Sequence, residues 1–171
     1  RCLIVNGDDY HRWERGSEEW SDITHLHPDA NEISSLEADL SALRAGHAVR
    51  RPRYDHDSGR FVDDQILDSR PWLLVEGLHG LYSPRVRDQL QLRIFLSPHR
   101  LVQLSWLLQR DVAARGHQGP DVLRRFYERG ADRDRFILPQ LEHAQLVIGY
   151  APDGPATMDG VLAGDDLPLV V

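Results

Sequence analysis

The stretch Cys2-Leu-Ile-Val-Asn-Gly-Asp-Asp-Tyr-His-Arg-Trp-Glu-Arg15 decides the fold class of this chain. Its apolar residues 2–5 are typical of a buried strand, in which Cys2 is expected to be a small core residue. Asn6-Gly7 then suits a sharp turn. Acids, bases and cations follow at once, and open α/β folds bind their ligands at the carboxyl ends of such strands. The alternative is a solvated loop after a core strand.

The composition indicates an ordinary globular domain. The chain has 171 residues, of which 41% are hydrophobic and 27% charged, enough for one core. No apolar run approaches the length of a membrane span, so we expect no membrane partner. The net charge of −7 argues against general nucleic-acid binding. A single cysteine permits no internal disulfide and fits a reducing compartment, so we expect a cytoplasmic location.

The basic residues are unusual, because all 20 are arginine and lysine is absent. Arginine binds phosphate through a rigid two-pronged set of donors. Without lysine, no Walker A loop, which ends in Gly-Lys-Ser/Thr, can occur in these residues. Since the first residue is not methionine, we expect Arg1 to lie inside a larger protein.

Residues 29–63 predict a helix followed by a hairpin. The apolar residues that recur on one helical face are Ile33, Leu36, Leu40 and Leu43. Gly46 is expected just beyond the last turn, and either Asp29 or Ser34 at the start. Two short polar strands between 49 and 63 are joined by a turn at residues 57–59. This hairpin is too polar for a central sheet, and its Tyr-Asp-His segment is either functional or merely tolerated.

A second apolar run, Trp72 to Val75, predicts another buried strand that ends at Glu76. An acid in this position resembles the Walker B carboxylate beside nucleotide-bound magnesium. A short helix from 84 to 90 and a third strand from 92 to 96 follow. Because parallel strands end at one sheet edge, we expect Asp8 and Glu76 to emerge there together.

Residues 97–150 predict a long helix, a glycine-rich break, a second helix and a strand at 146–150. Ser97 is the expected cap of the first helix, which should run through Arg115. Its expected inner stripe is Leu101, Leu104, Leu108 and Val112. Arginines before the break suit the hinge of a mobile flap, although a plain charged helix end is the alternative. The tail from 151 to 171 is expected to be loosely ordered.

Alternating strands and helices predict an α/β fold with a mostly parallel sheet covered on both faces. The motifs are identified as those of the phosphoribulokinase/uridine kinase family, and they resemble its phosphoribulokinases more. They are the quoted run 7–15, Pro28-Asp-Ala-Asn31, Tyr54-Asp-His-Asp-Ser-Gly59, Glu76-Gly-Leu-His79 and the lid-like Gln109-Arg-Asp-Val-Ala-Ala-Arg-Gly-His117. The resemblance covers residues 1–150 and implies a P-loop NTPase-like three-layer α/β/α domain with a small hairpin and a helical lid.

The resemblance also implies roles for individual residues. Asp8 would be the general base, and Glu76 would serve Mg²⁺. The sugar phosphate would be held by His11, Arg12 and Arg15, with Tyr54 and His56 on the other side of the substrate. In the lid, Arg110 and Arg115 would reach the phosphates of ATP, with Asp111 beside them as a further catalytic residue.

Two departures from the family pattern matter. The P-loop is absent, so the nucleotide cradle is expected outside this chain, and Leu107 stands where the family usually has a lysine. We therefore expect a kinase domain for ribulose 5-phosphate or a similar sugar phosphate, with ATP and Mg²⁺ as cofactors. The alternatives are a uridine-type nucleoside kinase and a non-catalytic domain for binding or regulation. A homo-oligomer is possible.

Overall fold

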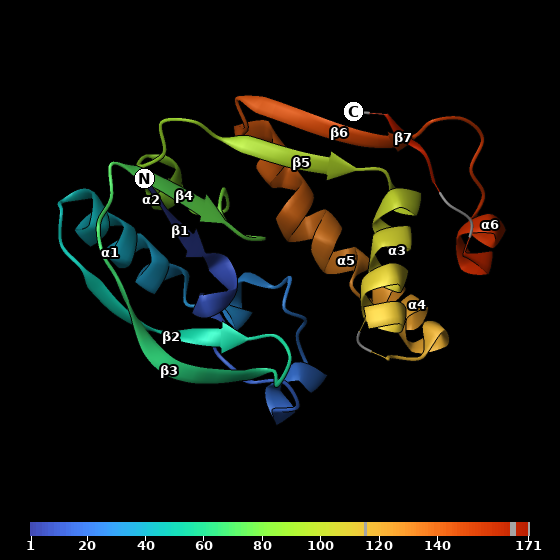
Figure 1. The fold of residues 1–171 in the computed structure, drawn as a ribbon, viewed down its shortest axis with the longest axis horizontal. Coiled ribbons are helices and arrows are strands. Elements are labelled where there is room, and N and C mark those ends of the chain that lie inside the picture. Colours follow the sequence, from blue (N-terminus) through green and yellow to red (C-terminus); the bar gives the residue numbers. More distant parts are fainter. Residues whose placement is uncertain (115, 165–166, 171) are drawn as a thin grey trace. The chain divides into compact units, whose positions relative to one another are not determined.

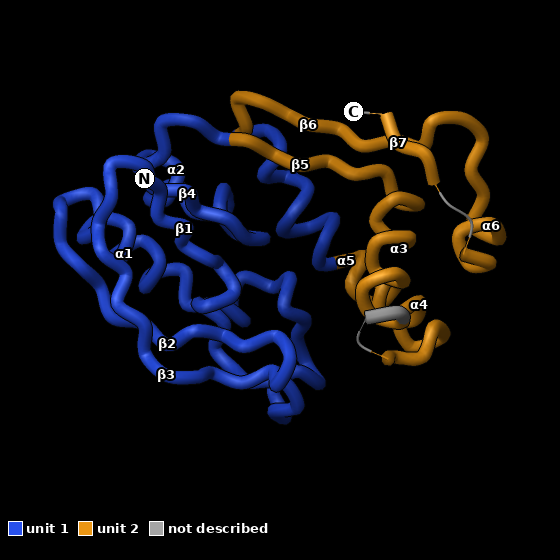
Figure 2. Tube along the Cα trace, in the orientation of Figure 1, with its two compact units in different colours: residues 1–93, 132–143 blue, residues 94–131, 144–171 orange. Residues whose placement is uncertain are grey.

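The computed structural model describes residues 1–114, 116–164 and 167–170. Two compact units can be distinguished in it (Figure 2). Unit 1 consists of Arg1–Arg93 and Asp132–His143, and unit 2 consists of Ile94–Ala131 and Ala144–Val171. Arg115, predicted at the hinge of a lid, lies outside the described residues.

Unit 1 contains a parallel strand pair and an antiparallel hairpin. Strand β1 (Cys2–Asn6) pairs in parallel with β4 (Trp72–Glu76), and the two lie side by side in Figure 1. Strand β2 (Val49–Asp55) pairs with β3 (Arg60–Leu67) and confirms the predicted hairpin. The helical segments are η1 (Gly7–Tyr10), η2 (Glu18–Ser21), η3 (Pro28–Ala30), α1 (Ile33–Arg44), α2 (Pro84–Arg87), η5 (Arg133–Ile137) and η6 (Leu138–His143).

Helix α1 supplies much of the core of unit 1, as its apolar face predicts. Leu36, Leu40 and Leu43 are buried in a cluster with Val5, Tyr10, Leu67 and Val86. The predicted start of this helix at Asp29 or Ser34 is wrong, because Glu32 is the N-terminal flanking residue. The preceding residues form the separate 3-10 turn η3, and the α-helix therefore begins only at Ile33.

The strands β1 and β4 bury one face only, which corrects the prediction of strands buried on both sides. Alternate residues of a strand point to opposite faces, and Leu3, Leu73 and Val75 pack against the core. On the other face, Ile4 and Leu74 are about half exposed, at 52% and 51%. Cys2 lies on that face and is exposed, so its assignment to the core is also wrong.

Unit 2 contains a second parallel pair, β5 (Ile94–Pro98) with β6 (Leu146–Pro152), and β7 (Leu169–Val170) pairs antiparallel with β6. Its core is Leu104, Phe126 and Val161. The helical segments are α3 (Arg100–Leu108), η4 (Gln109–Ala114), α4 (Gly119–Glu128), α6 (Met158–Ala163) and α5 (Gly130–Asp132), which ends at the junction of the units. Parallel strands and helices in both units confirm the predicted α/β class.

The long lid helix begins later than predicted. Ser97 and Pro98 end β5 instead of starting the helix, and the His99 side chain caps α3 by accepting from the Leu101 amide. The register of β5 against β6 extends through Pro98, so sheet pairing overrides the local capping signal. Past Leu108 the chain continues as the π-helix η4, in which Val112 is exposed and not part of an inner stripe.

The C-terminal tail has more regular structure than expected. Val161 of α6 is buried in the core of unit 2, and Ala151 and Pro152 of β6 pair with β7. These contacts tie residues of the tail to the preceding sheet, whereas composition alone suggested loose order. The domain boundary at residue 150 stays a prediction. Among the described residues, no helix combines the length and apolar character needed to cross a membrane.

Candidate active site

Two glycines bring the ends of β1 and β4 into close contact. A Cβ atom on Gly7 would lie 2.8 Å from the carbonyl oxygen of Glu76, and one on Gly77 would lie 2.9 Å from the Cα of Gly7. Only residues without a side chain permit this approach. Asp8 and Glu76 therefore line one small cavity at the same sheet edge, together with His11, as the sequence predicts.

The Asp8 carboxylate lies between two imidazole rings. One oxygen is 3.7 Å from Nε2 of His11, and the other is 3.2 Å from Nε2 of His56. The Asp8 amide donates to the Oδ1 of Asn6, which caps η1 and fixes the start of the turn. The Asp8 side chain is 31% exposed, so both its oxygens lie near imidazole nitrogens while remaining accessible to a ligand.

The Tyr54 ring packs against both of these imidazole rings. Its ring meets His11 and His56 edge to face, with ring centroids 5.1 and 5.3 Å apart. Burial raises the pKa of the Tyr54 hydroxyl, although the nearby Arg15 opposes the shift. The predicted substrate residues His11, Tyr54 and His56 are thus brought together around Asp8.

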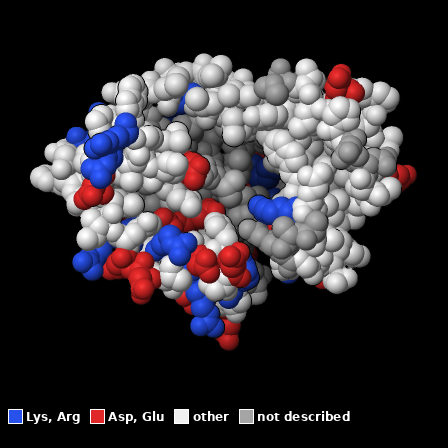
Figure 3. Space-filling view, in the orientation of Figure 1, with Lys and Arg blue, Asp and Glu red and all other residues white. Residues whose placement is uncertain are grey.

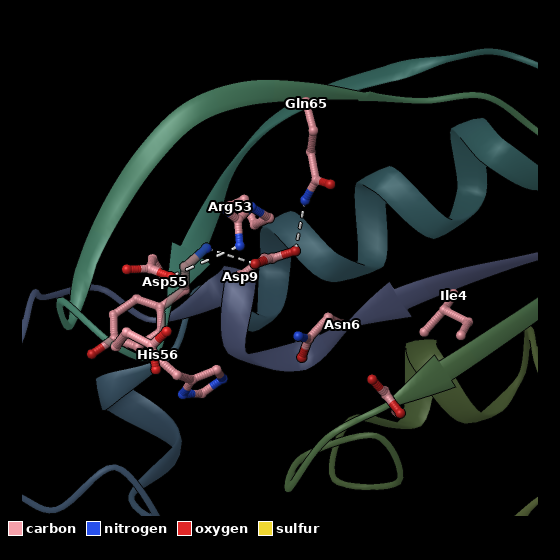
Figure 4. Close-up of a pocket in the computed structure, with 10 residues that line it drawn as sticks. Ile4, Asn6, Asp9, Arg53, Asp55, His56 and Gln65 are labelled. Carbon is pink, nitrogen blue, oxygen red and sulfur yellow. Dashed lines mark hydrogen bonds and ion pairs between the residues drawn. The ribbon is translucent and has the colours of Figure 1, made fainter. Parts of the chain in front are cut away.

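Asp9 is a site residue that the sequence analysis missed. It is buried, and it accepts hydrogen bonds from the Tyr54 amide at 2.7 Å and from Nε2 of Gln65 at 2.8 Å (Figure 4). Burial raises the pKa of the Asp9 carboxyl, while the two hydrogen bonds and Arg51 oppose the shift. Because Asp9 belongs to η1 and both donors belong to the hairpin, these hydrogen bonds connect the hairpin to η1. The adjacent pair Asp8-Asp9 was a visible signal, but sequence alone does not tell which member faces the ligand.

The predicted cationic cluster is divided between two places. Arg12 forms an ion pair with Glu32, with 3.4 Å between Nε and Oε1. Arg15 lies against the hairpin turn and donates to the carbonyl oxygens of His56 at 2.6 Å and Asp57 at 3.4 Å. Figure 3 shows basic side chains among acidic ones over this hairpin region of unit 1. Arg15 thus contacts the hairpin turn that carries His56, whereas the Arg12 side chain contacts Glu32.

An open cavity of about 340 Å³ adjoins these residues on the uncovered face of β1 and β4. Residues of β1, such as Ile4 and Asn6, and hairpin residues such as His56 line it (Figure 4), as does Glu76. Within the described part of the chain, the Glu76 carboxylate has no hydrogen-bond or ion-pair partner. Mg²⁺ in nucleotide sites is held by one or two carboxylates, with water and phosphate oxygens as further ligands. Glu76 fits that donor set.

The described part of the predicted lid lies in unit 2. Arg110 donates to both oxygens of Asp111, at 2.7 and 3.2 Å, so this acid orients the guanidinium. Arg129 is a further basic residue that no sequence signal marked. Burial lowers the pKa of its guanidinium, nearby Arg125 and Arg110 add to the shift, and Asp111 opposes it. The roles of Arg110 and Asp111 in a reaction stay predictions.

Most of this chain is similar in sequence to known proteins. The Phosphoribulokinase / Uridine kinase family matches residues 4–155. The chain is 34% identical to the chloroplastic phosphoribulokinase of Spinacia oleracea and 32% identical to the phosphoribulokinase of Synechocystis, over 149 residues in each case. These alignments cover 87% of this chain, but only 37% and 45% of the two relatives. The chain thus spans less than half the length of these relatives.

A solved structure extends the likeness to the fold. The phosphoribulokinase from Rhodobacter spheroides superposes with a TM-score of 0.74 over 91% of this chain and 62% of its own, at 22% identity. The shared fold agrees with the α/β class that the alternating strands and helices predict. The family match, the identities and the paired strand ends carrying Asp8 and Glu76 lead to one conclusion: the chain belongs to the phosphoribulokinase/uridine kinase family.

Proposed function

We propose that the protein containing this chain transfers the γ-phosphoryl group of ATP to a hydroxyl of a sugar phosphate, and that ribulose 5-phosphate is the acceptor. The observation that carries this proposal is the Asp8 carboxylate, held between two imidazoles at the strand edge that also bears Glu76. Phosphoryl transfer depends mainly on positioning and on stabilising charge. It requires a base at the acceptor hydroxyl and a metal carboxylate, and this edge offers both.

In this proposal Asp8 takes the proton of the attacking hydroxyl. The O–H bond breaks as the oxygen attacks the γ-phosphorus, the new P–O bond forms, and ADP leaves with the electrons of the broken P–O bond. Glu76 would hold Mg²⁺, which supplies charge neutralisation at the phosphate oxygens. Arg110, kept in orientation by Asp111, would face nucleotide phosphates. We assign the phosphate cradle to residues outside these 171, because the chain contains no lysine for a Walker A loop.

Arg15 favours a sugar phosphate over a nucleoside. Its exposed guanidinium lies beside His56, which in turn contacts Asp8. A phosphate dianion gains charge-assisted hydrogen bonds from such a group, whereas a neutral nucleoside does not. Arg12 contributes less in this proposal, because Glu32 already neutralises it.

Steady-state kinetics on the full-length protein test this function. We expect phosphorylation of ribulose 5-phosphate with Mg-ATP, and a loss of roughly 10²–10⁴ in kcat for Asp8→Asn, the range typical of a missing general base. Asp63→Asn is the matched control, because Asp63 is an exposed acid on β3, and it should keep the wild-type rate. Efficient phosphorylation of uridine with none of ribulose 5-phosphate would replace this proposal by a nucleoside kinase. A fully active Asp8→Asn protein would remove Asp8 as the base.

A further inference from the structure

Asn31 is buried directly opposite His11. The two residues form an isolated antiparallel bridge, flanked by hydrogen bonds from the Arg12 amide to Ala30 O at 3.0 Å and from the Glu32 amide to Tyr10 O at 2.7 Å. The Asn31 side chain therefore meets the imidazole from a backbone that is fixed on both sides. Asn31 is only 7% exposed.

The hydrogen bonds of Asn31 determine which way its amide points. Its Nδ2 donates to the carbonyl oxygens of His27 at 3.0 Å and His25 at 3.3 Å. Carbonyl oxygens can only accept, so a flipped amide would set oxygen against oxygen at both. The Oδ1 atom must then face His11, where it lies 2.8 Å from Nδ1.

This orientation determines the tautomer of His11. The Asn31 oxygen can only accept, so Nδ1 of His11 must carry the hydrogen, and the Nε2 of the neutral ring is then bare. The ring is nearly buried, with 9% of its side chain exposed, and it is held edge to face by Tyr54 and Trp20. The neutral His11 ring therefore turns a lone pair, not an N–H, toward Asp8.

Two acceptors now lie side by side. The bare Nε2 is 3.7 Å from an Asp8 carboxylate oxygen. Two lone pairs cannot bond each other, but they match a molecule that brings hydrogens to both. The other titratable groups around His11 are His56 across Asp8, the buried His79 and the Tyr54 hydroxyl. A polyhydroxylated sugar supplies two such hydrogens from separate hydroxyl groups.

We propose that Asn31 is a positioning residue that holds His11 as the Nδ1–H tautomer, so that Nε2 of His11 and the Asp8 carboxylate accept hydrogens from two hydroxyls of the acceptor. The second half of this statement rests on the proposed function. It revises the expectation that His11 binds substrate phosphate, because a bare nitrogen offers nothing to an anion. In this arrangement Arg15 binds the phosphate, and Nε2 of His11 accepts a hydrogen bond from a hydroxyl of the sugar.

Nitrogen NMR of the full-length protein tests the first half without any substrate. In spectra recorded at alkaline pH, we expect His11 to show a protonated Nδ1 and a bare Nε2. The wild-type spectrum alone decides the tautomer, whether or not any variant folds. A protonated Nε2 in the wild type would overturn the proposal.

Two variants separate positioning from general loosening of the loop. Asn31→Leu removes the accepting oxygen, and the His11 tautomers should then mix. Thr24→Val loosens the same loop, because Thr24 donates to Asp132 at 2.7 Å and accepts from the Leu26 amide, but Asn31 Oδ1 stays in place. This control should keep the Nδ1–H signature. If the His11 tautomers mixed to the same extent in Thr24→Val, the role of Asn31 would be merely structural and the inference would be wrong.

Kinetics with ribulose 5-phosphate test the second half. We expect Asn31→Leu to raise the acceptor KM about tenfold, the loss of roughly one good hydrogen bond, while Thr24→Val and the ATP KM change little. An unchanged acceptor KM in Asn31→Leu with a mixed tautomer would overturn the hydroxyl role. If the wild type shows the Nδ1–H tautomer but phosphorylates no sugar phosphate, the proposed function fails and the positioning of His11 by Asn31 stands.

Discussion

Arg15 and His56 are joined by a short hydrogen bond, in which the guanidinium donates to the His56 carbonyl oxygen at 2.6 Å. The Arg15 amide also donates to Gly59 O at 2.7 Å. The arginine proposed to hold substrate phosphate therefore also closes the hairpin turn that carries His56. In that proposal, acceptor binding and the position of the hairpin are coupled through this residue.

The hairpin turn leaves no room beside Arg15. A Cβ atom on Gly59 would lie 2.5 Å from the Cβ of Arg15, and the Gly59 backbone has a φ of +71°. We expect Gly59→Ala to destabilise the protein by more than the roughly 1–2 kcal/mol of a left-handed backbone alone. Gly46→Ala is the control, because Gly46 has a φ of +89° with nothing within 4 Å. Urea unfolding of both variants measures the difference, and equal losses would contradict the predicted clash.

Arg15→Ala should raise the acceptor KM by roughly ten- to a hundredfold, because a hydrogen bond to a charged group contributes about 1.5–3 kcal/mol. The ATP KM should change little. Arg12→Ala should have a much smaller effect, because Arg12 is paired with Glu32. Steady-state kinetics with ribulose 5-phosphate compare the two, and equal increases would mean that both arginines contact the acceptor.

Arg51 links the hairpin to the core of unit 1. Its guanidinium lies 3.6 Å from the centre of the Tyr10 ring and 3.1 Å from the Asp39 carboxylate, which also accepts from the Tyr10 hydroxyl. We expect Arg51→Ala to cost about 1.5–3 kcal/mol of unfolding free energy.

The neighbouring Arg50→Ala serves as the control for Arg51. Its side chain is 70% exposed, and its ion pair with Asp64 is 3.9 Å long, so we expect a change within about 0.5 kcal/mol. Chemical denaturation of the two variants checks the contrast. A loss in Arg50→Ala that matched the one in Arg51→Ala would show that burial does not distinguish the two residues.

His79 should make stability depend on pH. Burial lowers the pKa of this imidazole, although its hydrogen bond to Leu26 O opposes the shift. The unfolded chain then binds more protons than the folded one below about pH 6.5, so stability is lost as the pH falls through that value.

The variant His79→Gln keeps an N–H for the Leu26 carbonyl but does not titrate. We expect the wild type to lose up to about 1.4 kcal/mol per pH unit relative to this variant between about pH 6.5 and 5.5. His47→Gln, at an exposed histidine after α1, should follow the wild type. Parallel pH profiles for the wild type and His79→Gln would contradict a shifted His79.

Local sequence patterns were enough to predict several elements. The apolar spacing of Leu36, Leu40 and Leu43 predicted the buried face of α1, and the turn at residues 57–59 predicted the hairpin. Both patterns lie within the segment whose structure they predict. No contact with residues distant in the sequence is therefore needed to predict that structure. The placement of Asp8 and Glu76 at one edge followed from the strand order alone.

Other features depended on partners far away in the sequence. Ser97 and Pro98 carry a local signal for a helix start, but pairing with β6 keeps them extended. Strands β1 and β4 are apolar up to their last residues, Asn6 and Glu76, yet one face is exposed, because hydrophobicity does not tell what will cover a face.

The sequence by itself determined the fold class, the family motifs and the candidate base Asp8. Only the tertiary structure decided which neighbours these residues have. It paired Arg12 with Glu32, set Arg15 on the hairpin turn and placed Asn31 against His11. The physical reason is that hydrogen bonds and ion pairs act over about 3–4 Å, and such proximity between residues distant in the chain exists only after folding.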